Sequence, residues 1–163
     1  MFLDEQLGNG CVWINLDVEK IKNLEDLSEI YGLDKETIEY ALDKNERAHM
    51  DYNRENGTVT FIYNVLDLEK DKDYYEAIPM TFIVENKRMI TISNHKNAYV
   101  IDQMLAYLDS HESLSIYKFL FASLEIISNA YYPIIEKMDK SKDEVNSLLR
   151  QRTTCLLYTS PSP

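Results

Sequence analysis

Acidic side chains are the groups in this sequence whose type and spacing could do chemistry. Glu36, Glu39 and Asp43 follow one another at spacings of three and four residues in a predicted helix, so their carboxylates can lie on one face. Mg²⁺ and Ca²⁺ take oxygen ligands, and Mg²⁺ keeps several of its waters, so that a pair of carboxylates can be enough to hold it. The alternative interpretation is an ordinary solvated helix face. An acidic metal-dependent hydrolase would need several convergent carboxylates in a cleft, and the sequence offers only this one helical group.

Other residue types that carry catalysis form no recognisable pattern. His49, His95 and His111 are far apart in the sequence, and none has a second metal ligand at helical spacing. No glycine-rich phosphate loop, nucleophile elbow or HExxH pattern occurs in a chain with only four glycines. We therefore predict that the chain is not an enzyme.

The charge balance narrows the possible partners. Among 163 residues, 17 Lys and Arg stand against 28 Asp and Glu, which gives a net charge of −11. The field of such a chain repels phosphate backbones, and this argues against nucleic acid as a partner. The first ten residues contain two acids and no basic residue, unlike a signal peptide, and no apolar run reaches the roughly 20 residues needed to cross a bilayer. We expect a folded, acidic, intracellular protein.

Hydrophobic periodicity places the acidic group within a series of short elements. Asp17 and Asp34 are predicted helix N-caps, and Gly32 is predicted to end the first helix, whose apolar stripe is Val18, Ile21, Leu24, Leu27 and Ile30. The expected order is strand 11–16, helices 17–31 and 34–44, strands 49–53, 58–66, 77–85 and 88–93, and helix 98–108. This order predicts an α+β fold, in which a small mixed or antiparallel sheet with flanking helices occupies residues 1–112.

Residues 113–152 are predicted to form a separate, long helical segment. Its apolar positions step by four and three residues, as in a coiled coil: Ile127, Tyr131, Ile134, Met138, Ser141, Val145 and Leu148. Pro133 is expected to kink or divide this helix. Because helix stability comes mainly from packing of the apolar stripe, the segment is expected to need a partner helix.

The last residues do not continue the helical pattern. Residues 155–163 lack charge and periodicity, and they resemble the translation of a transposon-type sequencing adapter. We interpret residues 153–163 as a non-native tail, with a natural disordered tail as the alternative. On this interpretation Cys11 is the one native cysteine, and we expect the chain to be a fragment of a longer protein.

A set of motifs resembles the CorA family of magnesium transporters in its order and spacing. The matching stretches are GCVWINL (10–16), YGL (31–33), IEYALD (38–43), ERA (46–48), MDY (50–52), TFI (60–62), IP (78–79), RMITI (88–92), YPIIEKM (132–138) and DE (143–144). The resemblance implies the cytosolic amino-terminal domain of a membrane protein that assembles as a homopentamer. It further implies a long stalk helix, two carboxy-terminal transmembrane helices and a Gly-Met-Asn tripeptide that recognises hydrated Mg²⁺, and none of these parts occurs in this sequence.

The resemblance also implies a regulatory site. In the family, Mg²⁺ between neighbouring cytosolic domains holds the channel closed, and an acidic residue of the second helix contributes to that site. The matching position here is Tyr40, so Glu39 and Asp43 are the candidate metal-binding residues in its place. The implied function is a cytosolic regulatory domain, on the cytoplasmic side of the cell membrane, of a Mg²⁺ or divalent-cation transporter. The alternative is a soluble α+β interaction module that associates through its C-terminal amphipathic helix.

Overall fold

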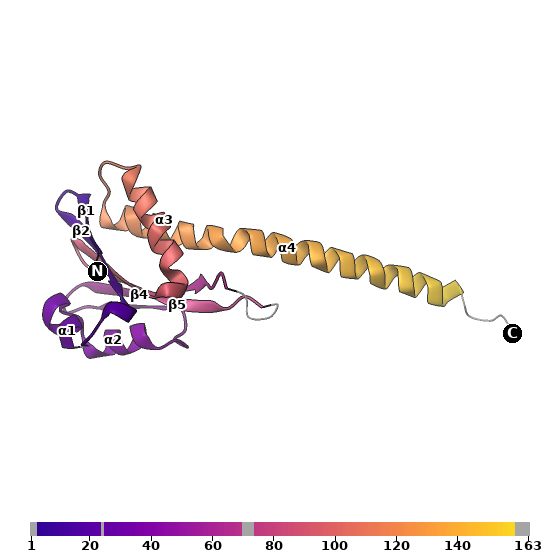
Figure 1. Ribbon diagram of the computed structural model, residues 1–163, viewed down its shortest axis with the longest axis horizontal. Helices are drawn as coiled ribbons and strands as arrows, with labels where there is room; N and C mark the ends of the chain where they lie inside the picture. Colours follow the sequence, from indigo (N-terminus) through magenta and orange to yellow (C-terminus); the bar gives the residue numbers. More distant parts are fainter. Residues whose placement is uncertain (1–2, 24, 70–73, 159–163) are drawn as a thin grey trace. The chain divides into compact units, whose positions relative to one another are not determined.

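A computed structural model of the chain describes residues 3–23, 25–69 and 74–158, and describes side chains as far as residue 150. The contacts divide the chain after Ile127 into two units, which are described in turn (Figure 1). The first unit holds a sheet with its covering helices, and the second holds the greater part of one helix. Leu24, one of the predicted stripe residues, lies outside the described residues.

The first unit is built on one six-stranded sheet with the order β1-β2-β6-β5-β4-β3. Every neighbouring pair is antiparallel except β2 and β6, which run parallel, so the predicted mixed sheet and the α+β fold class are confirmed. The strands are β1 (Leu3–Gly8), β2 (Cys11–Asp17), β3 (His49–Asn53), β4 (Thr58–Leu66), β5 (Ala77–Val84) and β6 (Arg88–Ser93).

Strand β1 is an element that the hydrophobic pattern did not predict. It pairs with β2 around the turn Gly8-Asn9-Gly10, where all three residues have positive φ angles. As an edge strand it places Asp4 and Gln6 in solvent, and Leu7 is its one fully buried side chain among the described residues. Three consecutive polar residues, Asp4, Glu5 and Gln6, hide the strand pattern, because an edge strand buries little of its surface.

The predicted helix 17–31 is wrong, because this segment forms two separate pieces. Asp17 Oδ1 accepts the Glu19 N–H at 3.1 Å and caps only the 3₁₀ turn η1 (Val18–Lys20), after which Ile21 is extended. Helix α1 (Glu25–Tyr31) then starts anew, with Leu27 buried and Ile30 66% exposed. The predicted stripe is therefore not continuous. The second predicted helix exists as α2 (Lys35–Leu42), and Asp34 is its N-cap.

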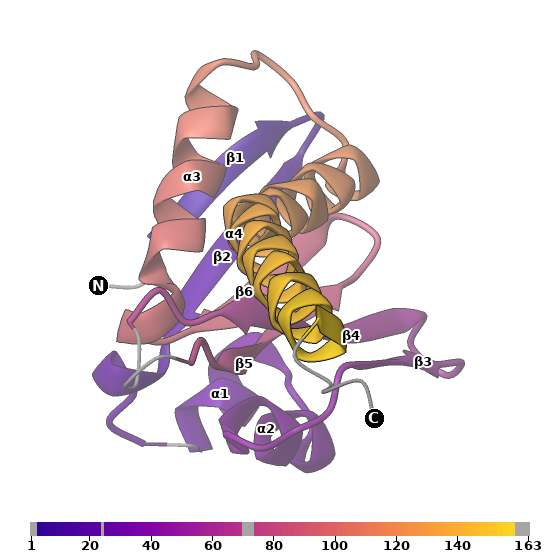
Figure 2. The same cartoon turned by 90° about the vertical axis from the view of Figure 1, so that its right-hand side faces the viewer.

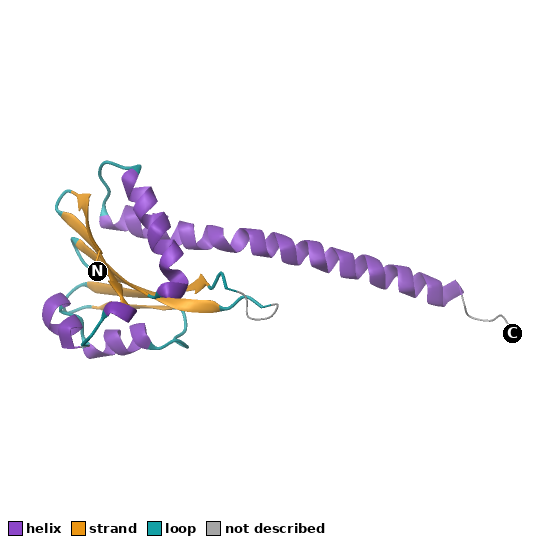
Figure 3. Cartoon of the chain, viewed as in Figure 1, coloured by secondary structure: helices purple, strands orange, loops and turns teal. Residues whose placement is uncertain are grey.

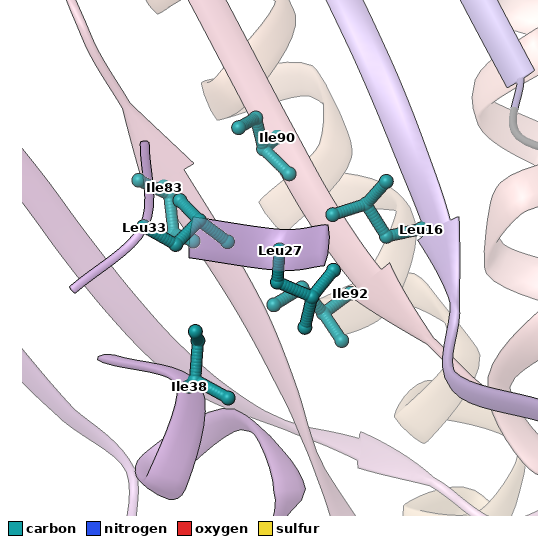
Figure 4. Close-up of a cluster of buried hydrophobic side chains, with 7 residues drawn as sticks. All are labelled: Leu16, Leu27, Leu33, Ile38, Ile83, Ile90 and Ile92. Carbon is teal, nitrogen blue, oxygen red and sulfur yellow. The ribbon is translucent and has the colours of Figure 1, made fainter. Parts of the chain in front are cut away.

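Helices α1 and α2 cover one face of the sheet, and α3 (Ala98–Asp109) covers the other (Figures 1 and 2). The 3₁₀ turn η2 (His95–Asn97) leads from β6 into α3. Figure 4 shows the core between the sheet and the first two helices. This core contains Leu16, Leu27, Leu33, Ile38, Ile83, Ile90 and Ile92, all buried.

On the opposite face of the sheet, beneath the first turns of α4 (Ile116–Tyr158), lies a chain of buried hydrogen bonds. The Trp13 indole N–H donates to Thr91 Oγ1 at 3.0 Å, and the Thr91 hydroxyl donates to Asn15 Oδ1 at 2.8 Å. The Trp13 ring also meets Phe119 edge to face, with 5.1 Å between ring centroids. These contacts tie β2 to β6 across the parallel pair.

The second unit begins at Ser128 and contains the remainder of α4, which is one uninterrupted helix (Figure 3). The helix passes through Pro133, so the predicted division does not occur. A proline removes one backbone N–H from the ladder, and at an exposed position water can satisfy the carbonyl that is left. Beyond Pro133 the apolar positions Met138, Val145 and Leu148 are 67%, 55% and 60% exposed. No helix within the described ranges is both long enough and apolar enough to cross a membrane.

Candidate metal site and neighbouring cleft

Helix α2 carries the candidate acids, and its N-cap and buried face fix their direction. Asp34 Oδ1 accepts the Thr37 N–H at 2.7 Å, which secures the first turn. Ile38 is buried against the sheet, so Glu39 points to solvent. The Glu39 carboxylate lies 3.4 Å from Lys35 Nζ in an exposed pair that contributes little to stability.

Asp43 closes α2 as its C-cap residue. Its backbone N–H donates to the Glu39 carbonyl at 3.1 Å, and its Oδ1 accepts the Asn45 N–H at 2.9 Å. The side chain is exposed, and it keeps oxygen lone pairs beyond this one bond. Asp43 therefore turns the chain away from the helix while presenting a carboxylate one helical turn from Glu39.

Tyr40 occupies the position where the family resemblance implies an acid, and it is engaged in a different interaction. Its hydroxyl donates to Glu36 Oε1 at 2.7 Å, and its ring meets the His49 ring edge to face at 5.3 Å. The hydrogen bond to Glu36, together with the negative charge of that carboxylate, raises the pKa of Tyr40 above its usual range. Glu36 is thus bound to Tyr40 instead of joining Glu39 and Asp43.

The three carboxylates of the predicted acidic face each have a different neighbour in the structure. Among the described residues, no group of three or more Asp, Glu, His or Cys side chains lies close enough together to hold a metal ion. Glu39 and Asp43 remain a predicted pair. As exposed carboxylates one turn apart, they could supply two oxygen ligands to a Mg²⁺ ion that keeps its other waters.

Next to Asp43 lies a cavity of about 620 Å³, which the sequence pattern did not reveal. Its walls come from four separate stretches of the chain, at residues 18–19, 41–45, 76–79 and 92–96. Two of these stretches follow the carboxyl ends of the parallel strands β2 and β6, the edge at which mixed and parallel sheets commonly bind ligands. Polar strand ends at Asp17 and Ser93 were the one sequence signal for this site.

Two side-chain contacts involve residues that line this cavity. His95 Nδ1 contacts Glu19 Oε1 and links the turns that follow β6 and β2. Lys96 Nζ lies 2.5 Å from Oδ2 of Asp67, a residue only 2% exposed, and Oδ1 of Asp67 accepts the Glu69 N–H at 2.9 Å. The hydrogen bond from Lys96 holds the pKa of Asp67 below its usual range. Glu19, His95 and Lys96, which line the cavity, therefore each have a side-chain partner within the chain.

The other two histidines also lie beside local partners. His49 Nδ1 is 2.8 Å from the Arg47 carbonyl, and His111 stacks on Tyr107 with 4.1 Å between ring centroids. The structure therefore does not bring the three histidines together.

Comparison with known proteins finds a matching family model and several solved structures with a similar fold. A family model described as CorA-like Mg²⁺ transporter protein matches residues 8–157. The soluble domain of CorA from Methanocaldococcus jannaschii is similar, with TM-score 0.65, 18% identity, and coverage of 87% of this chain and 56% of that one. The complete CorA magnesium transporter from the same organism gives TM-score 0.67, 18% identity, and coverage of 91% and 47%.

The cytoplasmic domain of ZntB from Vibrio parahaemolyticus RIMD 2210633 is also similar, with TM-score 0.66, 11% identity, and coverage of 82% of this chain and 54% of that one. The chain thus spans about half the length of these solved structures. No curated protein sequence matches it.

Proposed function

We propose that this chain, which belongs to the CorA-like Mg²⁺ transporter protein family, is the cytosolic regulatory domain of a transporter for Mg²⁺ or another divalent cation. The observation that carries the proposal is the family match over residues 8–157, together with a fold shared with the soluble domain of a CorA protein. In this proposal the pore belongs to a longer protein, which assembles as a homopentamer in the cell membrane with this domain on the cytoplasmic side.

The transporter part of the proposal is tested by the genome from which the chain comes. In that genome, the natural gene is expected to continue past Arg152 in place of the non-native tail. It should encode a long amphipathic helix, followed by two strongly apolar segments of about 20 residues each. Amplifying and sequencing the locus across this point provides the test. A stop codon soon after Arg152 would contradict the proposal.

The regulatory part concerns Mg²⁺ as a ligand of the exposed pair Glu39 and Asp43. Their carboxylates lie one turn apart, and the neighbouring Lys35 is exposed enough to move away. The net charge of −11 raises the local concentration of divalent cations around the domain. One chain would supply two ligands, and water or a second copy would supply the others.

A thermal unfolding measurement tests this site. With a Kd of about 1 mM, 10 mM Mg²⁺ stabilises the native state by about 1.4 kcal/mol, and a domain of this size would then melt about 3–5 °C higher. The reference sample contains NaCl at the same ionic strength, because salt alone screens the repulsion among the acids. Differential scanning calorimetry of the full chain gives the melting temperature.

The double variant Glu39→Gln, Asp43→Asn is expected to lose the Mg²⁺-dependent part of this shift. Glu29→Gln removes an exposed acid of α1 and should retain the shift, which makes it the matched control. Equal shifts in all three proteins would place the ion elsewhere. No shift in the unsubstituted chain would remove the regulatory proposal while leaving family membership intact.

A second candidate function is an interaction module that associates through α4. The exposure of Met138, Val145 and Leu148 favours it, because an apolar stripe in water is unfavourable for an isolated helix. Association of this kind would be independent of Mg²⁺. Sedimentation with 10 mM Mg²⁺ and with a chelator therefore separates the two candidate functions.

A further inference from the structure

The sequence contains two Asn-Gly pairs, Asn9-Gly10 and Asn56-Gly57, and each lies in the turn of a hairpin. Asparagine before glycine is especially prone to lose its side-chain amide, because glycine has no Cβ to hinder the approach of its nitrogen to the asparagine Cγ. All four residues are exposed. Gly10 and Asn56 also line one cavity of about 560 Å³, so water reaches both turns. The local hydrogen bonds must therefore decide which pair reacts.

The reaction at such a pair needs only water and base. Hydroxide removes the proton of the glycine N–H, and the nitrogen attacks Cγ of the asparagine to close a cyclic imide. The bond from Cγ to Nδ2 breaks, and the side-chain nitrogen leaves as ammonia. Water then opens the imide at either carbonyl, which yields aspartate or isoaspartate. In total one water is added and one ammonia is lost, with no oxidant or reductant.

In the turn between β3 and β4, the attacking group is already engaged. The Gly57 N–H donates to the Asn53 carbonyl at 2.9 Å, and Asn56 Oδ1 accepts the Thr58 N–H at 3.0 Å. Both distances lie in the favourable range for N–H···O hydrogen bonds. This turn has to open before the Gly57 nitrogen can lose its proton, so the reaction in the folded chain is slow.

In the turn between β1 and β2, the corresponding groups are available. Asn9 and Gly10 have φ angles of +52° and +70°, as in a two-residue turn of type I′. The Gly10 N–H forms no hydrogen bond within the residues that the structure describes. The Asn9 amide has one contact, from Nδ2 to Ser113 Oγ at 3.4 Å, which is long and therefore weak. Reaction here does not first require the loss of a strong hydrogen bond.

A positive charge lies beside the same turn. A Cβ placed on Gly10 would be 4.0 Å from Nζ of Lys87. Lys87 is exposed, and across residues 3–23, 25–69 and 74–150 no acidic side chain pairs with it. Its ammonium group therefore favours the negative charge that develops when the Gly10 nitrogen loses its proton and attacks.

We propose that Asn9 is a modification site, at which the Gly10 nitrogen converts the side chain to aspartate or isoaspartate while the second Asn-Gly pair is protected. Isoaspartate carries the main chain through one extra methylene group. Because a two-residue turn sets the register of its strands, the longer main chain disturbs the pairing of β1 with β2. Leu7 of β1 is buried, and its carbonyl accepts the Leu114 N–H at 2.6 Å, so the disturbance reaches the segment before α4. This inference does not rest on the proposed transport function.

Mass spectrometry of the full chain, aged at mildly alkaline pH, provides the first test. Trypsin releases residues 1–20 and 55–70 as separate peptides, and fragment ions locate the modified residue within each. A reacted peptide is about 1 Da heavier, because an amide NH₂ becomes OH. In the folded chain Asn9 should react at least about fivefold faster than Asn56, the factor that corresponds to one hydrogen bond of about 1 kcal/mol.

The same measurement in concentrated guanidinium chloride is the control for the local sequence. Both turns are lost in the unfolded chain, and the two rates are expected to agree within about twofold. Asn9→Gln lengthens the side chain and should leave residues 1–20 unmodified in either state.

Lys87→Met tests the contribution of the neighbouring charge. In the folded chain it should slow the reaction at Asn9 about twofold to threefold, as expected for an exposed charge. In guanidinium chloride it should leave the rate unchanged. Lys44→Met removes an exposed lysine that follows α2, and as the matched control it should not alter the rate at Asn9.

Melting temperatures separate the effect of the new charge from that of the altered main chain. Asn9→Asp has the charge of the products with an ordinary main chain, and aspartate tolerates a left-handed conformation, so it should melt with the original protein. The aged fraction with one extra negative charge, isolated by anion exchange, contains both products. Its isoaspartate chains should melt about 2–4 °C lower.

Several outcomes would overturn the proposal. One is a folded chain in which Asn56 reacts as fast as Asn9, and another is a rate ratio that stays the same in guanidinium chloride. A folded chain that does not react at Asn9, under conditions in which the unfolded chain reacts, would also contradict it. An aged fraction that melts with Asn9→Asp would refute the effect on β1, and an unchanged rate in Lys87→Met would refute the role of that charge.

Discussion

Replacing Thr91 with valine is expected to destabilise the first unit by about 2–3 kcal/mol, although the two side chains have nearly the same shape. The Thr91 hydroxyl accepts the Trp13 indole N–H and donates to Asn15 Oδ1, and all three residues are buried. Valine leaves both partners without a hydrogen bond, at a cost of roughly 1–3 kcal/mol each. The added methyl group returns only about 0.8 kcal/mol.

Urea unfolding of the two variants Thr91→Val and Thr91→Ser provides the assay. Serine keeps both hydrogen bonds and removes one buried methyl group, so it is expected to cost only about 1 kcal/mol. Trp13 is the one tryptophan of the chain, and its fluorescence therefore reports on this site directly. In a thermal scan the valine variant is expected to melt about 5–10 °C below the original protein.

The outcome that refutes this reasoning is a valine variant at least as stable as the serine variant. Such a result would mean that the hydrogen bonds of the Thr91 hydroxyl add nothing to the stability beyond the packing of the side chain. A double-mutant cycle with Trp13→Phe, followed by circular dichroism, supplies an independent check. Coupling of about 1 kcal/mol is expected between the two positions, because either substitution removes the same hydrogen bond.

Two further substitutions test other contacts of the first unit. Lys96→Met removes the hydrogen bond that lowers the pKa of Asp67. That stabilisation is present above the unfolded pKa of about 4 and is lost as the pH falls through the lower folded value. The melting temperature of the variant should therefore lie below that of the original protein at pH 7 and approach it near pH 2.5. Lys118→Met is the control. An equal loss of melting temperature at both pH values would contradict this reasoning. Gly8→Ala should cost about 1–3 kcal/mol, because φ is +100° and the new Cβ would lie 2.5 Å from Ser113 Oγ. Gly57→Ala should destabilise the protein less, because φ is +73° there but the new Cβ would have no atom within 4 Å. Chemical denaturation measures both changes in stability, and equal losses in the two variants would contradict the predicted clash at Gly8.

The strands that the sequence predicted best are β3, β4 and β6, which have the predicted bounds. Turn residues border these β-prone runs in the sequence, so their ends could be placed without knowledge of the packing. The helix predicted over residues 17–31 was wrong. Its apolar residues have helical spacing, but tertiary packing buries Leu27 and leaves Ile30 exposed.

The candidate site was predictable only in its local parts. The spacing of Glu36 and Tyr40 by four residues indicates a contact within one helix, and the structure contains it. The cleft beside Asp43 could not be predicted in the same way, because residues 18–19, 41–45, 76–79 and 92–96 meet only through the sheet order. A pattern within one helix carries no information about segments that lie far away along the chain.

The parallel pairing of β2 with β6 also sets an order of assembly. Val12 faces Arg88, 88 − 12 = 76 residues later, and closing a loop of that length costs about 4 kcal/mol of chain entropy. Strands β3 to β6 join neighbours along the chain and can form first. The amino-terminal hairpin has no place to dock until Ser93 has left the ribosome, so we infer that this edge is the last part of the sheet to be completed during synthesis.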